Sequence, residues 1–338
     1  MKTNDLKYFS EVDGLEPRIF YHYTSLEALY NIVQSKTFRL TSLRSSNDRK
    51  ELSYNRGEFL KDFKTVCENE KDENTRLWLN LFAENVDKNT AKFFKECAGK
   101  HTPYALCLSK KRDNLTHWAR YASNCTGVCI GFNISALDVL YRRARSPYFG
   151  STLLDVEDVI YTQDTLLPSI RNNLLQIIIG LFESAKSNPS IDPKTIVEKA
   201  GYVYLGAVYQ KIMKFVKNGS FVDEDEIRIY YETETIPNIL SIIDSMTKDV
   251  DEDSKNEIRM RYTALVDLMQ IQEERFMMTG SGIRSYHELC LDDIWGSGVI
   301  PEIILGSMCT QNRKDLERFL TYNGLKDTKV RISKIPIR

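Results

Sequence analysis

The stretch IFYHYTSLEALYNIVQSKTFRLTSLRSSND (residues 19–48) decides the fold. Residues 19–21 are β-branched or aromatic, as is typical of a strand. Thr24-Ser25-Leu26-Glu27 fits the capping-box pattern S/T-x-x-E, which predicts that a helix starts just after His22. Apolar residues then recur at helical spacing, and residues 38–41 alternate in the manner of a half-buried strand. We therefore predict a strand, a capped helix and a second strand.

The junction between the first strand and the helix carries His22 and Tyr23. Both residues lie beside the free amides of a helix N-terminus, where an anionic or hydrogen-bonding ligand is stabilised. A structural histidine next to a well-capped helix is the interpretation that this stretch alone favours. The two interpretations are separated only by the rest of the chain.

The whole chain has the composition of a globular protein. It has 338 residues, 42% hydrophobic and 28% charged, with a formal net charge of -1. That charge excludes a strong global attraction to nucleic acid or to an anionic membrane. The first 14 residues lack the apolar core of a secretory signal, and no apolar run reaches the roughly 18 residues that span a bilayer. We predict a cytoplasmic protein.

Seven cysteines are scattered along the chain, an odd number without a C-x-x-C pair. Reduced thiols explain this pattern best. Cys107, His117, Cys125 and Cys129 could be arranged into a zinc site, but two of these cysteines lie in apolar runs typical of buried strands. We predict no metal.

A second informative region covers residues 102–132. It predicts a strand that ends in Ser109, a short helix at 116–122, and a strand at 127–132 with a glycine near each end. Trp118 and Tyr121 lie three apart and project from one face of the helix. Packing against the sheet is the alternative role for this aromatic pair.

A third region, FVDEDEIRIYYE (residues 221–232), predicts a strand that begins near Glu226. If strand geometry reaches back to Glu224, the two carboxylates point the same way. The alternative is an acidic loop that enters a strand.

The remaining segments complete one α+β domain. We expect helices over most of 49–98, with a core stripe of Trp78, Leu81 and Phe82. The other expectations are a strand at 156–161, long helical insertions at 166–218 and 236–291, a mixed loop at 281–295, a strand at 301–306, a helix at 310–320 and a strand at 329–335. The core strands then fall in 16–165, 219–235 and 292–338. The segment YRRARSPY (residues 141–148) fits a solvated loop or a phosphate- or base-contacting patch.

Taken in order, several short motifs resemble the bacterial domain-of-unknown-function 2971 family. They are Tyr21-His22-Tyr23-Thr24-Ser25, Asn47-Asp48, Leu108-Ser109, Trp118 with Tyr121, GVCIGF (127–132), Glu224-Asp225-Glu226-Ile227-Arg228 and IILG (303–306). Arg49 follows Asn47-Asp48 where such proteins often have proline. Each motif is weak, and their order carries the resemblance.

That family is similar in plan to ADP-ribosyltransferases, which build a split, bent β-sheet around NAD. The resemblance implies that His22, Tyr23, Thr24, Ser109, Trp118 and Tyr121 bind NAD, and that Glu226, His22 and Tyr121 are catalytic. It further implies that Glu224, Arg228, Asn47 and Asp48 bind the acceptor. Cleavage of the nicotinamide bond develops positive charge on the ribose, so a carboxylate such as Glu226 stabilises the transition state more than the ground state.

We therefore expect an enzyme that transfers ADP-ribose from NAD to a protein or nucleic acid, as a toxin or anti-phage effector. The alternatives are an NAD glycohydrolase that uses water as the acceptor, or an inactive module that binds a nucleotide or nucleic acid. The helical insertions are candidate surfaces for a second copy or a neutralising partner.

Overall fold

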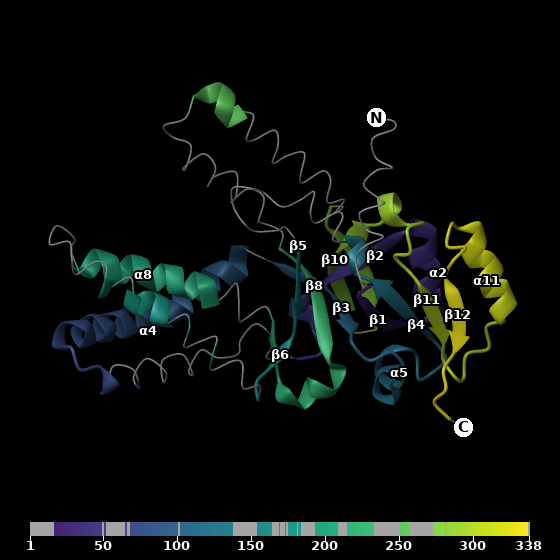
Figure 1. Ribbon diagram of the computed structural model, residues 1–338, viewed down its shortest axis with the longest axis horizontal. Helices are drawn as coiled ribbons and strands as arrows, with labels where there is room; N and C mark the ends of the chain where they lie inside the picture. Colours follow the sequence, from purple (N-terminus) through teal and green to yellow (C-terminus); the bar gives the residue numbers. More distant parts are fainter. Residues whose placement is uncertain are drawn as a thin grey trace. The chain divides into compact units, whose positions relative to one another are not determined.

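The computed structural model describes residues 17–48, 51, 65, 68–100, 102–137, 154–163, 169, 173, 175–180, 182–183, 193–208, 215–232, 251–256, 273–280 and 282–336. Contacts divide the chain into two compact units. The first consists of Met1–Ser42, Tyr104–Glu157 and Asp223–Arg338, and the second of Leu43–Pro103 and Asp158–Val222. Figure 1 shows the elements of both along the chain.

The first unit is built on an open, mainly antiparallel sheet. Its strands in the described residues are β1 (Ile19–Thr24), β2 (Thr37–Ser42), β3 (Pro103–Ser109), β4 (Val128–Asn133), β5 (Leu154–Asp158), β8 (Glu226–Glu232), β9 (Arg275–Thr279), β10 (Gly282–Cys290), β11 (Glu302–Leu305) and β12 (Lys329–Ile332). The main order is β12-β11-β4-β1-β3-β2-β10-β9, and β8 pairs with both β3 and β5. The β11–β12 pair is parallel.

Strand β3 changes its partner along its length. Near its start, Tyr104 and Ala105 pair with β2. At its end, Ser109 pairs with Tyr21 of β1. Cys107 therefore lies between two short ladders, so β1 and β2 adjoin different ends of the same strand.

Strand alternation gives this sheet two distinct faces. The larger core takes Leu106 and Leu108 of β3 together with Ile227 and Ile229 of β8. Helix α2 (Leu26–Ser35) and helix α11 (Arg313–Tyr322) pack their apolar residues against this core. A smaller cluster contains Tyr21, Tyr23, Trp118, Ala122, Cys125, Cys129 and Ile304. It covers the other face of β1 with helix α5 (Leu115–Tyr121).

The second unit has its own core between helices α4 (Glu73–Lys100) and α8 (Pro193–Val208). Strands β6 (Ile160–Tyr161) and β7 (Val216–Lys217) form a separate parallel pair. Pro193 begins α8 because a helix tolerates proline at its first position. Phe82 is buried and Trp78 partly buried, as the predicted stripe requires, but Leu81 is 40% exposed and Leu79 takes the core position.

Several local predictions are corrected. The cap of α2 is Ser25, whose Oγ accepts a hydrogen bond from the N–H of Ala28, so the helix does not begin with Thr24. Similarly, Asn312 caps α11, so this helix begins at Arg313 and not at residue 310 as predicted. The strand expected at 156–161 is divided between β5 and β6, which belong to different sheets.

The largest error concerns residues 281–295, which were predicted as a mixed loop. Instead β9 and β10 form a hairpin, and β10 pairs with β2 from Tyr286 to Cys290. The second expected helical insertion therefore contains two strands of the sheet. Residues 141–148, and most of 49–72 and 233–272, lie outside the described residues.

Gly306 lies where two backbone segments approach closely. A Cβ added there would lie 2.1 Å from the carbonyl oxygen of Cys125. We expect Gly306→Ala to lower the free energy of unfolding by about 1–3 kcal/mol, the usual cost of overpacking. Urea denaturation measures this. Gly280→Ala is the control, because nothing lies within 4 Å of the added atom. Equal urea midpoints for the two variants would contradict the prediction.

Candidate functional site

Three segments of the first unit meet at Glu224, which ends a short 3-10 helix (Gly219–Glu224) just before β8. The carbonyl oxygen of Glu224 accepts a hydrogen bond from Ser109 Oγ at 2.7 Å. The Nε2 of His117 lies 3.1 Å from the same oxygen. Because Ser109 ends β3 and His117 lies on α5, this carbonyl joins a strand end and a helix.

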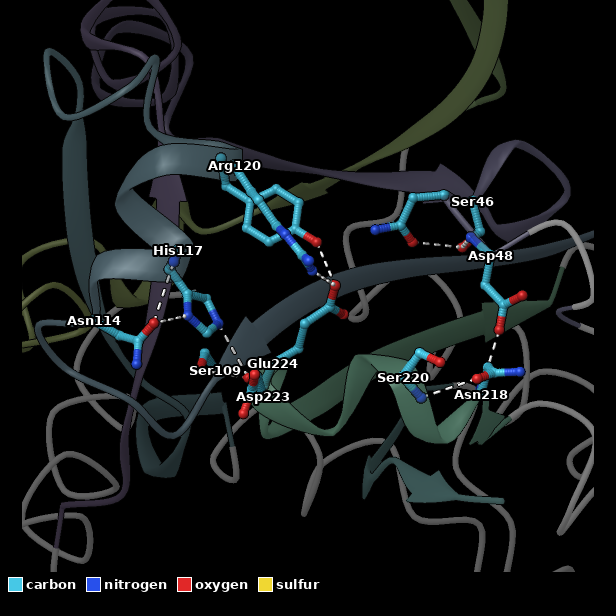
Figure 2. A network of polar contacts seen from close by, with 12 residues as sticks. Ser46, Asp48, Ser109, Asn114, His117, Arg120, Asn218, Ser220, Asp223 and Glu224 are labelled. Atoms are coloured by element: carbon cyan, nitrogen blue, oxygen red, sulfur yellow. Dashed lines mark hydrogen bonds and ion pairs between the residues drawn. The ribbon is translucent and has the colours of Figure 1, made fainter. Parts of the chain in front are cut away.

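The carboxylate of Glu224 is held by α5 as well. The hydroxyl of Tyr121 donates to Glu224 Oε1, and Arg120 Nη1 lies 3.8 Å from that oxygen. Glu224 is buried although it is charged, and a buried carboxylate needs such donors. Figure 2 shows His117 and Arg120 directed from α5 towards Glu224. We call Ser109, His117, Arg120, Tyr121 and Glu224 the Glu224 network.

His117 has an oxygen atom beside each ring nitrogen. Asn114, the cap of α5, places its Oδ1 2.9 Å from Nδ1 and accepts a hydrogen bond from the backbone N–H of His117. Burial lowers the pKa of His117, and the Glu224 carbonyl and carboxylate offset only part of this effect. The imidazole of His117 is therefore neutral and donates one ring hydrogen bond. This hydrogen bond helps to fix the orientation of α5.

Glu226 and Arg228 form a buried ion pair on β8. Their relative exposures are 4% and 0%, and Arg228 Nε donates to Glu226 Oε1 at 2.8 Å. Strand geometry does not reach back to Glu224, because Asp225 has a φ of 44° in the left-handed region. The prediction that the two carboxylates point the same way through strand alternation therefore fails.

His22 lies where β3 changes its partner. The Nδ1 of its half-buried ring is 3.2 Å from the carbonyl oxygen of Cys107, the residue between the two ladders of β3. The ring also meets Phe38 edge-on at 5.9 Å between centroids. Burial lowers the pKa of His22, against the effect of the Cys107 carbonyl. Alternation places His22 on the face of β1 opposite to Tyr21 and Tyr23.

Other predicted NAD-binding residues have packing or bracing contacts. The Tyr23 hydroxyl donates to the carbonyl of Lys111 at 2.8 Å and accepts from the N–H of Asn114 at 3.0 Å. Trp118 is fully buried and donates from its indole nitrogen to Asp113. It therefore packs against the sheet, while Tyr121, one turn later, reaches Glu224. Thr24 is half-buried and stays in the β1–β4 ladder opposite Val128.

Asn47 and Asp48 belong to the second unit. Asp48 Oδ2 accepts a hydrogen bond from the N–H of Asn218 at 3.0 Å, and Ser46 Oγ donates to Asn47 Oδ1 at 3.3 Å. Figure 2 also draws this group, including Ser220, whose N–H donates to Asn218 Oδ1. In these contacts Asp48 braces the turn at Asn218.

A second polar cluster centres on Glu302 at the start of β11. Arg112 donates to both carboxylate oxygens at 2.7 Å, and Arg331 Nε donates to Oε2 at 3.0 Å. The Tyr21 hydroxyl donates to Oε1 at 3.3 Å. Burial, with Glu302, raises the pKa of Tyr21 to about 12, so the phenol keeps its proton.

One comparison with known proteins found a similarity that covers part of this site. Residues 117–229 of the 338 match the model of the family described as Protein of unknown function (DUF2971). This segment resembles DUF2971. No curated protein and no solved structure matches the chain. The predicted resemblance to that family is supported, and its similarity to ADP-ribosyltransferases stays a prediction.

The matched segment, residues 117–229, contains most of the Glu224 network. It begins at His117 and includes Arg120, Tyr121, Glu224 and Glu226, whereas His22 and Ser109 lie before it. His117, Arg120 and Asn114 were missed as site residues by sequence reasoning. An asparagine cap three residues before a histidine was the available signal for Asn114 and His117. The contact of His117 with Glu224 spans 107 residues and has no local signature.

The contacts of Glu302 lead us to predict that part of the free energy of unfolding depends on pH. Hydrogen bonding by Arg112 lowers the pKa of Glu302, although burial opposes this. A lowered folded-state pKa stabilises the fold above the unfolded pKa, about 4.3, and the gain is lost as pH falls through the folded value. We therefore expect Glu302→Gln to be less stable than the wild type at pH 7, with the gap closing below about pH 4.3. Urea unfolding at several pH values measures the gap.

The control for this measurement is Glu157→Gln, because Glu157 is exposed at the end of β5. A gap between Glu302→Gln and the wild type that stays constant from neutral to acidic pH would contradict the role given to ionised Glu302.

Proposed function

We propose that the chain binds NAD and transfers its ADP-ribose group to a macromolecule. The observation that carries the proposal is the Glu224 network. Ser109, Tyr121 and Glu224, three residues expected at such a site, come from separate segments and meet immediately before Glu226. The change of partner along β3, with His22 beside it, is consistent with the split sheet of ADP-ribosyltransferases.

Glu226 is proposed to engage the ribose next to nicotinamide. Its carboxylate is fixed by Arg228, and a preorganised negative charge stabilises the sugar cation that develops as the bond breaks. Arg228 thereby acts as the residue that sets the orientation of this carboxylate.

Tyr121 and Ser109 are proposed to orient the rest of NAD from the face of β1 that α5 covers, and His22 from the opposite face, where β3 changes its partner. Tyr121 is half-buried at the end of α5, so its ring can contact nicotinamide while its hydroxyl stays on Glu224. Nicotinamide leaves as a neutral ring, which needs orientation more than protonation. A neutral His22, consistent with its lowered pKa, donates or accepts hydrogen bonds without adding charge. Ser109 supports the turn that precedes Glu226.

The acceptor is proposed to be a protein or a nucleic acid, with Glu224 facing it. We infer the toxin or anti-phage role from what such enzymes commonly do, and fold-level likeness alone does not set it. A cytoplasmic setting fits this role. None of the helices in the described part of the chain has the length and hydropathy for a membrane crossing.

A second candidate function is a binding module without turnover. It is favoured by the burial of Glu226 and by the donors that already hold both carboxylates, Glu224 and Glu226. In this case NAD or a related nucleotide binds and no bond breaks. A glycohydrolase, with water as the acceptor, uses the same residues as the transferase.

One assay separates the three functions. The protein is incubated with NAD labelled in the adenylate part, with and without bacterial lysate proteins or RNA, and nicotinamide is quantified by chromatography. Label on a macromolecule supports transfer, and free ADP-ribose alone supports hydrolysis. Calorimetry that shows binding without nicotinamide release supports the module. Neither binding nor release would overturn all three.

A further inference from the structure

Asp113 lies in the loop between β3 and α5 and gathers three hydrogen bonds. Trp118 Nε1 donates to its Oδ1 at 2.6 Å, and Ser333 Oγ donates to the same oxygen at 2.7 Å. The N–H of Lys334 donates to Oδ2 at 3.0 Å. Burial opposes ionisation, but these three donors hold the pKa of Asp113 below its usual value. The carboxylate therefore joins α5 to the chain just after β12. Figure 1 shows this part of the chain passing α5.

The donor on α5, Trp118, determines where that helix lies. Its ring is fully buried and meets Tyr23 edge-on at 5.1 Å between centroids. Tyr121 follows three residues later on the same face, so a shift of the indole moves the Tyr121 hydroxyl relative to Glu224. An indole that donates to a charged acceptor is held more strongly than one that donates to a neutral acceptor.

The loop that carries Asp113 is fixed on both sides. Arg112, the preceding residue, binds Glu302 through two hydrogen bonds. The hydroxyl of Tyr23 bonds to the backbone of Lys111 and Asn114. Because these contacts hold the loop, a change in the position of Asp113 also changes the position of the first turn of α5.

We propose that Asp113 is a positioning residue, which uses Ser333 and Lys334 of the C-terminal segment to fix α5 and thereby Tyr121 at Glu224. The activity part of this inference rests on the proposed function. Its structural part does not, because hydrogen exchange of the Trp118 indole proton is measured without NAD. The segment just after β12 then acts on a site whose other residues lie more than 100 positions earlier.

The test compares Asp113→Asn with the wild type by NMR and by kinetics. Asparagine keeps the shape but removes the charge, and its amide group opposes the Lys334 N–H. We expect hydrogen exchange of the Trp118 indole proton to rise at least about tenfold, as loss of a charge-assisted hydrogen bond implies. A Trp118→Phe variant assigns that proton. We also expect kcat for nicotinamide release to fall about tenfold, with KM changed less than about threefold, because misplaced groups slow the chemical step.

Ser333→Ala is the second variant, since it removes one donor without touching α5. We expect about a threefold rise in Trp118 indole exchange, as loss of one neutral hydrogen bond implies. The matched control is Ser297→Ala, because exposed Ser297 donates to the carbonyl of Ile294 in another turn. Unchanged indole exchange in Ser333→Ala, with Asp113→Asn either unchanged or unfolded, would overturn the positioning role. Wild-type protein without nicotinamide release would overturn the proposed function, and the indole measurement still decides the positioning role.

Discussion

Glu226→Gln is expected to lower the rate of nicotinamide release about 100-fold or more, the usual cost of removing one preorganised electrostatic group. Glutamine keeps an oxygen that can accept from Arg228 Nε, and circular dichroism checks that the variant is folded before the two rates are compared. What disappears is the negative charge that opposes the developing ribose cation. Release from a saturating NAD concentration, quantified by chromatography, measures the loss.

The matched control is Glu288→Gln on β10. Glu288 is a buried carboxylate with an arginine partner, Arg275, at 2.9 Å, but it lies outside the Glu224 network. We expect its release rate to stay within about twofold of the wild type, because Glu288 contacts none of the residues proposed to bind NAD. A Glu226→Gln enzyme as fast as Glu288→Gln would remove Glu226 from the mechanism.

Sequence reasoning found the elements whose pattern is local. β1, α2, β2, β3, α5 and β4 all lie within a few residues of their predicted positions. The cap of α2 was misplaced by one residue because Thr24 and Ser25 can both cap a helix. The choice depends on where β1 stops, and Thr24 stays in the ladder opposite Val128 of β4. That partner lies about 100 residues away and has no local signal.

The β9–β10 hairpin escaped prediction for a different reason. The apolar residues Phe276, Met278 and Ile283 of this hairpin are all strongly exposed. The hairpin therefore lacks the buried apolar face that gives an amphipathic strand its pattern. The sequence Gly280-Ser281-Gly282 between β-forming residues was the usable signal. In the candidate site, the left-handed Asp225 separates Glu224 from the strand, and an acidic run predicts no such conformation.

Arg228→Met is expected to lower the free energy of unfolding by about 3–5 kcal/mol, because it removes one partner of a buried ion pair and leaves the other charge desolvated. Arg228 is 0% exposed, and its Nε lies 2.8 Å from Glu226 Oε1. Methionine fills much of the same volume without a cavity. Urea denaturation with circular dichroism measures the change, and Arg313→Met, which breaks an exposed pair with Glu317, is the control.

The double variant Glu226→Gln/Arg228→Met separates charge from packing. If the cost of Arg228→Met comes from the desolvated carboxylate, making residue 226 neutral should restore at least about half of the lost free energy, as replacements of buried ion pairs by neutral groups do. If the cost comes from packing, the double variant is no more stable than Arg228→Met. The proposed mechanism adds a further requirement: the restored protein must still release nicotinamide about 100-fold more slowly than the wild type, because its stability has returned but the charge has not.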